Sequence, residues 1–179
     1  MDFYSKTKQT LASFGDERFF KDRHFFFNTN IVLQEVPDEI SICFNISGCQ
    51  LNCPGCSWRN LEMTPRELTR EFYTEILNQN KGLASCVVFM GGEWKHAELV
   101  WLLDTAREMG FKTALYTGQN HITLDLLQRL DYVKMGPWRP QHGPLNSNTT
   151  NQVFFKLEQI THKFQKNSDK ANACPLNQE

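Results

Sequence analysis

Long apolar runs are absent from this sequence, and none reaches the roughly 20 residues that a membrane-spanning helix needs. An excess of charge is absent as well, because 19 Lys and Arg residues oppose 20 Asp and Glu residues and leave a formal net charge of −1. We therefore expect neither a membrane span nor bulk attraction to nucleic acid or to an acidic membrane. The N-terminal stretch also lacks the apolar core of a secretory signal, so a cytoplasmic protein is expected.

The length and composition favour one folded domain, since the chain has 179 residues of which 40% are hydrophobic and 22% are charged. The pattern of polar and apolar residues changes twice along the chain. Residues 1–28 read as an N-terminal extension in which polar and aromatic residues alternate, and residues 29–158 read as the domain. Residues 159–179 form a polar C-terminal tail that we expect to be flexible.

Strand-like and helix-like segments alternate through the domain. Strands are expected over residues 31–36, 40–46, 86–90, 113–116, 132–135 and 153–156, and helices over residues 65–78, 97–109 and 124–130. The first helix is expected to begin at the capping box Thr64–Glu67, with Pro65 at the first helical position. This alternation predicts βαβ units and an α/β fold with a mainly parallel sheet. Because the units are few, we expect an open partial (βα) barrel rather than a closed eight-fold one.

The residues of chemical interest follow the ends of these strands. A cysteine-rich loop follows the strand over 40–46, and Gly91-Gly92-Glu93 follows the strand over 86–90. Thr117-Gly118 and Gly136-Pro137 follow the next two strands. Ligands of parallel sheets bind at the carboxyl ends of the strands, so the sequence predicts one site built from four strand ends.

Six cysteines stand out in a chain expected in the reducing cytoplasm, where clustered cysteines more often bind metal or react than form disulfides. Three of them lie in the stretch GCQLNCPGCSW, at Cys49, Cys53 and Cys56, with the spacing C-x3-C-x2-C. Three thiols within eight residues indicate a metal centre.

A fourth protein ligand, which a structural zinc site needs, is not evident. Cys43 and Cys86 fall within expected buried strands, where a thiol is an ordinary apolar side chain, and Cys174 lies in the polar tail with no assigned role. Zinc held by three cysteines and a water remains an alternative. A [4Fe–4S] cluster suits three thiolates better, because it leaves one iron open as a Lewis-acidic site for a chelating amino acid.

Together, the C-x3-C-x2-C spacing after an early strand and the Gly91-Gly92-Glu93 stretch after the next resemble the radical S-adenosylmethionine superfamily. The resemblance implies that the open iron binds S-adenosylmethionine. One electron from the reduced cluster then cleaves it to methionine and a 5′-deoxyadenosyl radical. It also implies that the backbone of Gly91–Glu93 holds the methionyl amino group, for which glycine allows close approach.

The run Gly-Cys-x3-Cys-Pro-Gly-Cys is similar to that of the activating proteins of anaerobic ribonucleoside-triphosphate reductase. So are the runs LDYVKMGPW and HGPLNSNTTNQ, the latter ending in Asn151-Gln152. The resemblance covers roughly residues 29–158. It implies a radical-generating enzyme that places a glycyl radical on the large reductase and takes its electron from a donor such as a flavodoxin. Trp94 and Ser57 depart from the pattern, since many relatives have proline and an aromatic residue there.

The resemblance also implies further cofactor contacts. Backbone contacts to the adenine are implied for Gly55, Cys56 and Ser57, and contacts near the cofactor's sugar for Tyr116, Thr117 and Gly118. We expect the loop over 136–151 to face the protein partner, while Asn151 and Gln152 either cap this loop or contact the partner. Two alternatives stay open: a radical enzyme acting on a small molecule, as in deazapurine formation, and a non-catalytic iron–sulfur or zinc protein.

Overall fold

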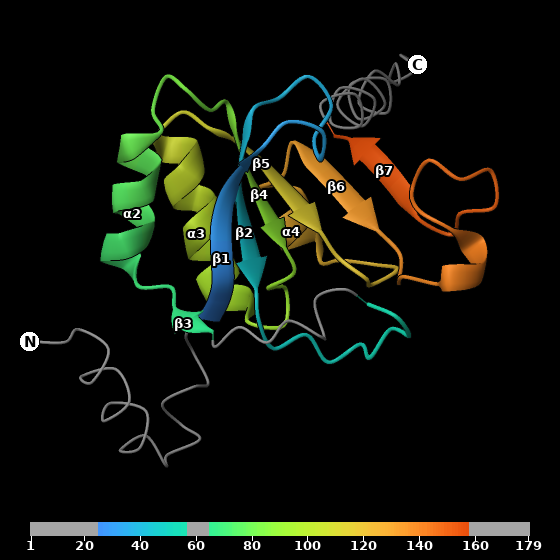
Figure 1. The fold of residues 1–179 in the computed structure, drawn as a ribbon. Helices are drawn as coiled ribbons and strands as arrows, with labels where there is room; N and C mark the ends of the chain where they lie inside the picture. Colours follow the sequence, from blue (N-terminus) through green and yellow to red (C-terminus); the bar gives the residue numbers. More distant parts are fainter. Residues whose placement is uncertain (1–24, 57–64, 158–179) are drawn as a thin grey trace, which may run out of the picture.

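The computed structural model describes residues 25–56 and 65–157, which form one mixed α/β domain around a seven-stranded sheet (Figure 1). The elements in chain order are β1 (Phe25–Val32), β2 (Ser41–Ile46), β3 (Arg66–Glu67), α2 (Arg70–Gln79), β4 (Cys86–Met90), α3 (His96–Glu108), β5 (Lys112–Tyr116), α4 (Leu124–Leu127), β6 (Tyr132–Met135), the 3-10 helix η2 (Pro140–His142) and β7 (Val153–Lys156).

The sheet has the strand order β3-β1-β2-β4-β5-β6-β7 and is open. Its four central strands, β2, β4, β5 and β6, are parallel to one another. Antiparallel strands complete both edges, with β1 and β3 on one side and β7 on the other. The expectation of an α/β domain with a mainly parallel sheet core is confirmed at this level.

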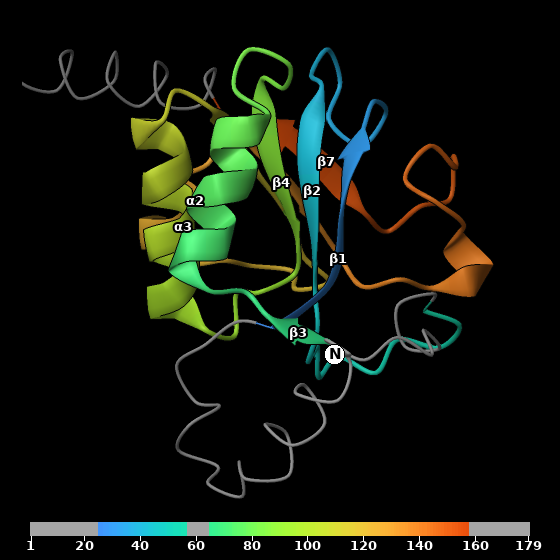
Figure 2. The ribbon, with the colours of Figure 1, turned by 60° about the vertical axis from the view of Figure 1, so that its left-hand side comes forward.

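The helices α2 and α3 cover one face of the sheet (Figure 2), and Leu126 of α4 belongs to the hydrophobic core on that face. Their main hydrophobic core is formed with the strand residues that point to this face, among them Phe44, Phe89 and Leu115. The opposite face is also buried, and there Cys43, Val88 and neighbouring side chains form a second, smaller cluster. Burial on both faces explains why these strands read as continuous apolar runs. No helix within residues 25–56 and 65–157 combines the length and apolar character needed to cross a membrane.

Several expected elements agree with the structure. The strands β4, β6 and β7 have the expected bounds, β5 begins one residue early, and α3 is displaced by one residue at each end. Gly110 follows the end of α3 with a φ of +91°, a conformation that glycine adopts without a steric penalty. Cys43 and Cys86 are buried in β2 and β4, as expected.

The expected start of the first helix is wrong. α2 begins at Arg70 rather than at Pro65, and its N-cap is Thr69, whose hydroxyl accepts a hydrogen bond from the Phe72 amide at 3.2 Å. The preceding residues, Arg66–Glu67, instead form the strand β3 and pair with β1. Pairing with β1 overrides the local capping signal here. The backbone groups of Arg66 and Glu67 find their hydrogen-bond partners in β1 instead of in a first helical turn.

Two further boundaries differ from the expectation. β1 spans Phe25–Val32 rather than residues 31–36, so it begins before residue 29, where we placed the start of the domain. Phe26 on this strand is 1% exposed, and packing its ring in the core stabilises the earlier pairing. α4 ends at Leu127 rather than at residue 130, and the chain then enters β6 through hydrogen-bonded turns.

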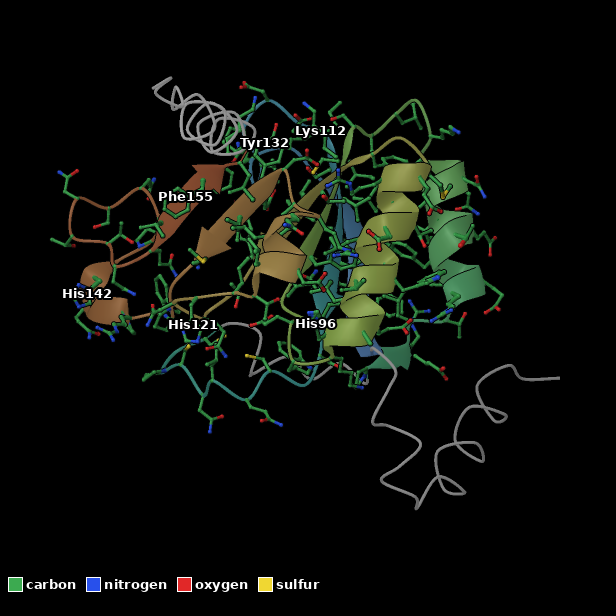
Figure 3. The ribbon with its side chains drawn as sticks, turned by 180° about the vertical axis from the view of Figure 1, so that it is seen from behind. His96, Lys112, His121, Tyr132, His142 and Phe155 are labelled. Carbon is green, nitrogen blue, oxygen red and sulfur yellow. The ribbon has the colours of Figure 1, made fainter. Side chains whose placement is uncertain are left out.

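A buried carboxylate ties the sheet together at the amino ends of its parallel strands. Both Lys112 Nζ and Tyr132 Oη donate hydrogen bonds to Glu39 Oε1, each at 2.6 Å. Figure 3 labels Lys112 and Tyr132, which lie at the end of the sheet opposite to the loop that follows β2. Structural polar contacts therefore occupy one end of the sheet, and the cysteine-rich loop lies at the other.

Candidate functional site

A cavity of about 530 Å³ lies at the carboxyl ends of the parallel strands. Nine of the eleven site residues expected from the sequence line it: Cys49, Cys53, Gly55, Cys56, Gly91, Glu93, Tyr116, Thr117 and Gly118. Gly92 is buried within the same turn as Gly91 but is not part of the lining. Ser57 lies outside the described residues.

The cysteines are carried by the loop that follows β2. The Cys56 amide donates a hydrogen bond to the Cys53 carbonyl at 3.2 Å, which closes a tight turn between these two cysteines. Gly55 within the turn has a φ of +67°, so a glycine is favoured there. Leu51 lies against Gly118, where an added Cβ would approach its Cδ1 to 2.5 Å. The loop is thereby packed onto the end of β5.

The three thiols share the cavity wall without converging on one point. Among the described residues, no three His, Cys, Asp or Glu side chains lie close enough together to hold a metal ion. Burial raises the pKa of the Cys49 thiol, and the negative charges of Glu93, Cys53 and Cys56 raise it further, against a backbone hydrogen bond from Leu51. A cationic centre of soft metal ions would bind cysteines in this arrangement as thiolates and would offset the repulsion between their charges.

The Gly91-Gly92-Glu93 turn follows β4 and is shaped by its glycines. Gly91 and Gly92 have φ angles of +87° and +112°. A Cβ on Gly91 would lie 2.7 Å from the ring of Trp94, so the indole packs directly on the glycine. The Trp94 Nε1 also lies 3.7 Å from the Cβ position of Gly48. Trp94 therefore joins this turn to the cysteine-rich loop.

Glu93 presents an unsatisfied carboxylate oxygen in this region. Its Oε1 accepts a hydrogen bond from the Thr117 hydroxyl, whereas its Oε2 is buried and has no partner among the described residues. Burial raises the pKa of Glu93, although the hydrogen bond from Thr117 opposes the change. A buried acceptor without a partner costs roughly 1–3 kcal/mol. An ammonium group or another N–H donor bound in the cavity would satisfy it.

Tyr116 has a structural role in addition to its place in the lining. Its hydroxyl donates a hydrogen bond to the Glu35 carbonyl, and its ring packs edge-on against Phe154. Burial raises the pKa of the Tyr116 hydroxyl to about 12, so this group stays protonated near neutral pH. Tyr116 thus lines the cavity at the end of β5, while its hydroxyl fixes the chain that follows β1.

Lys134 is the residue of the cavity wall that sequence reasoning missed. It lies on β6, and its Nζ donates a hydrogen bond to the Gly136 carbonyl at 3.3 Å. No carboxylate within the described residues forms a salt bridge with it. Burial lowers the pKa of Lys134, and the negative charges of Cys53 and Cys56 oppose this. A lysine inside an expected strand of a mainly parallel sheet, where strands are covered on both faces, was the available signal.

The remaining residues of the wall include Gly136, which follows a strand end as the sequence predicted. The others were not predicted as wall residues, because they come mainly from loops whose paths depend on tertiary packing. They are Ile46, Leu51, Met90, Trp94, Trp138, Leu145 and Gln152. The wall as a whole offers thiols, one carboxylate, one ammonium group and the backbone of glycine turns. It is therefore suited to bind a zwitterionic ligand beside a thiolate-ligated centre.

Comparison of the chain with models of protein families, with curated proteins and with solved structures finds no match.

Proposed function

We propose that this chain is an activating enzyme of the radical S-adenosylmethionine type that generates a glycyl radical on an anaerobic ribonucleoside-triphosphate reductase. The observation that carries the proposal is the gathering of nine expected residues, from separate strand ends, around one cavity. In this proposal the open sheet is the partial (βα) barrel of that superfamily. When bound, a [4Fe–4S] cluster and S-adenosylmethionine supply a 5′-deoxyadenosyl radical, formed with one electron from a donor such as a flavodoxin.

The residues of the cavity fit these groups in charge and in chemistry. Cys49, Cys53 and Cys56 supply the three thiolates that would hold the cluster. The unsatisfied carboxylate oxygen of Glu93 matches the methionyl ammonium group, and the ammonium group of Lys134 matches the methionyl carboxylate. The glycines of the Gly91–Glu93 turn let the backbone approach the ligand closely.

A protein substrate is favoured over a small molecule by the charges of the cavity. Glu93 and Lys134 are the two charged residues other than cysteines in the described lining, and the zwitterionic end of S-adenosylmethionine uses both. A charged small-molecule substrate would then lack an anchor. The loop over 136–151, which contains the exposed Arg139, forms the partner-facing lip in this proposal. The hydrogen atom removed from a backbone glycine ends on 5′-deoxyadenosine, and methionine is released.

Anaerobic reconstitution with iron and sulfide tests the proposal. With a strong reductant, we expect a cluster signal in electron paramagnetic resonance and, once S-adenosylmethionine is added, formation of 5′-deoxyadenosine. Cys53→Ala should abolish both, while Cys43→Ala, the same change at a buried cysteine outside the cavity, should keep them. Mixing with the candidate reductase should yield a glycyl radical signal. Zinc without iron, or a cluster without cleavage of S-adenosylmethionine, would contradict the proposal.

A further inference from the structure

The loop between β6 and β7 is fastened at its base by two adjacent side chains. Asn151 Nδ2 donates a hydrogen bond to the Pro137 carbonyl at 2.9 Å, and Gln152 Nε2 donates to the Gly136 carbonyl at 3.3 Å. Gly136 has a φ of +110°, and a Cβ there would lie 2.8 Å from the Asn151 carbonyl oxygen. The last residues of the loop are therefore bound directly to its first residues.

The rest of the loop is bonded within itself. His142 and Thr149 are joined twice, by a 3.0 Å contact between His142 Nδ1 and the Thr149 carbonyl and by a 3.0 Å hydrogen bond from the Thr149 hydroxyl to the His142 carbonyl. The Thr150 amide donates to the Ser147 carbonyl at 3.1 Å. Figure 3 labels His142, which lies far from the sheet in this loop. Because the loop is braced internally, the contacts at its base set its orientation.

The loop contributes part of the cavity wall and touches the cysteine-rich loop. Trp138 and Leu145 line the cavity. The Trp138 Nε1 and the Pro140 Cγ lie 3.8 Å and 3.7 Å from the Cβ position of Gly55, between Cys53 and Cys56. The Cys53–Cys56 turn is thus in contact with Trp138, which directly follows Pro137 at the fastened base of the loop.

We propose that Asn151 and Gln152 are positioning residues that hold Trp138 against the Cys53–Cys56 turn and so fix the cavity wall beside the cysteines. Both residues act by fastening the base of the loop that carries Trp138. Gln152 also lines the cavity, whereas Asn151 lies outside its described lining. The sequence left two roles open for them, capping of the loop or contact with the partner, and this proposal assigns them to capping of the loop. Their role in catalysis rests on the proposed function: a fixed Trp138 limits how the glycine-bearing segment of the partner enters.

Fluorine NMR of protein labelled with 5-fluorotryptophan tests the placement of Trp138 without any cofactor. The resonance of Trp138 is assigned as the one that Trp138→Phe removes. Asn151→Asp keeps the size of the side chain but replaces the donor by a second oxygen facing the Pro137 carbonyl. Gln152→Met removes the other donor at similar volume. We expect both variants to move the Trp138 resonance towards the solvent-exposed position, with the Trp101 resonance unchanged.

Thr149→Val is the matched control, because it removes a hydrogen bond at the far part of the loop and leaves the base intact. It should leave the Trp138 resonance in place. If both Asn151→Asp and Gln152→Met fold, as judged by thermal unfolding, and keep the wild-type resonance, the inference is overturned. If one variant does not fold, the other decides the result in the same way.

The effect of Trp138 placement on the reaction with the partner is measured as the ratio of glycyl radical formed to 5′-deoxyadenosine released. We expect Asn151→Asp to lower this ratio by about tenfold, the order of effect of one lost hydrogen bond that leaves a carbonyl unpaired, and Thr149→Val to leave it unchanged. A shifted resonance with an unchanged ratio would overturn the proposed effect on the reaction. If the wild-type protein yields no glycyl radical, the proposed function fails, while the fluorine result still decides whether Asn151 and Gln152 position Trp138.

Discussion

At the scale of single residues, Glu93 and Lys134 give the cavity a charge of each sign. Each is only partly satisfied within the described protein, because Glu93 Oε2 has no partner and Lys134 has only a carbonyl acceptor. Unpaired groups of this kind are costly in a folded chain. A ligand that carries both an ammonium and a carboxylate group offsets both costs at once, which is why these two residues are the most informative sites to change.

Lys134→Met should weaken binding of S-adenosylmethionine to the reconstituted protein by about tenfold or more, because a hydrogen bond to a charged group contributes roughly 1.5–3 kcal/mol. Isothermal titration under anaerobic conditions measures the change. Lys81→Met is the control, since Lys81 is exposed and does not line the cavity. Equal affinities for the two variants would show that Lys134 does not face the ligand.

Gly91→Ala should destabilise the protein more than Gly82→Ala. Both glycines have a positive φ, of +87° and +83°, so each substitution carries left-handed strain of roughly 1–2 kcal/mol. Only Gly91 lies against another side chain, and its new methyl group would collide with Trp94 at a further cost of about 1–3 kcal/mol. Urea unfolding measures both costs. Adding Trp94→Ala to Gly91→Ala should remove part of this excess cost, and equal stability of the two single variants would contradict the argument.

At the scale of elements, the start of α2 shows how a distant pairing decides a local boundary. The sequence Thr64–Glu67 has the form of a capping box, yet Arg66–Glu67 pairs with β1 and Thr69 becomes the cap. The helix that follows places Tyr73 in the core, where its hydroxyl donates to the Leu102 carbonyl of α3 at 2.9 Å. With its start at Arg70, α2 therefore presents Tyr73 to α3 within its first turn.

Thr69→Ala should lower the free energy of unfolding by about 1 kcal/mol, because the Phe72 amide loses its side-chain acceptor. Thr69→Ser, which keeps the hydroxyl, should have a much smaller effect. Chemical denaturation of the two variants and the wild type measures the difference. If Thr69→Ala were as stable as Thr69→Ser, the cap would contribute nothing and the assigned helix start would lose its energetic support.

At the scale of the whole molecule, polar contacts are divided between the two ends of the sheet. The contacts of Glu39 with Lys112 and Tyr132 link the turn after β1 to β5 and β6 at the amino ends of the strands. The cavity occupies the carboxyl ends. The contacts of Glu39 can therefore be tested without changing a residue of the cavity wall.

The stability of the protein should fall in acid partly because of Glu39. Burial alone would raise the pKa of this carboxyl, but hydrogen bonds from Lys112, Ser85 and Tyr132 outweigh burial and lower the pKa below 4.5. A carboxyl whose pKa is lower in the folded state stabilises that state above its unfolded pKa, and the stabilisation is lost as the pH falls through the folded value.

Glu39→Gln should therefore lower stability at pH 7 and flatten its decline below about pH 4.5. We expect a loss of roughly 1–2 kcal/mol at neutral pH, less than for a fully buried pair because Lys112 is half-exposed. Urea unfolding at pH values between about 3 and 7 measures the free energy of both proteins. An unchanged acid slope in Glu39→Gln would assign the decline to other carboxyls.

Much of the fold followed from local patterns. The strands β4, β6 and β7 could be placed because each is a short apolar or alternating run bounded by turn residues, and Gly110 marked the end of α3. The common location of the cysteine-rich loop, Gly91–Glu93 and Thr117-Gly118 could also be predicted, since the carboxyl ends of parallel strands meet at one edge of a sheet. Contacts of Gly55 and Tyr116 were named only on the resemblance. The first inference needs only local residue patterns and the second only the order of the elements, and both are properties of the chain itself.

Tertiary packing alone decided the rest, because it depends on residues far apart in the sequence. The pairing of Arg66–Glu67 with β1 moved a helix start, and burial of Phe26 moved a strand. No spacing rule places Lys134 in the cavity wall or Trp138 against Gly55, since both placements require strands and loops that meet only after folding. Local sequence thus determined which chemical groups follow each strand, and the folded structure decided which of them face one another.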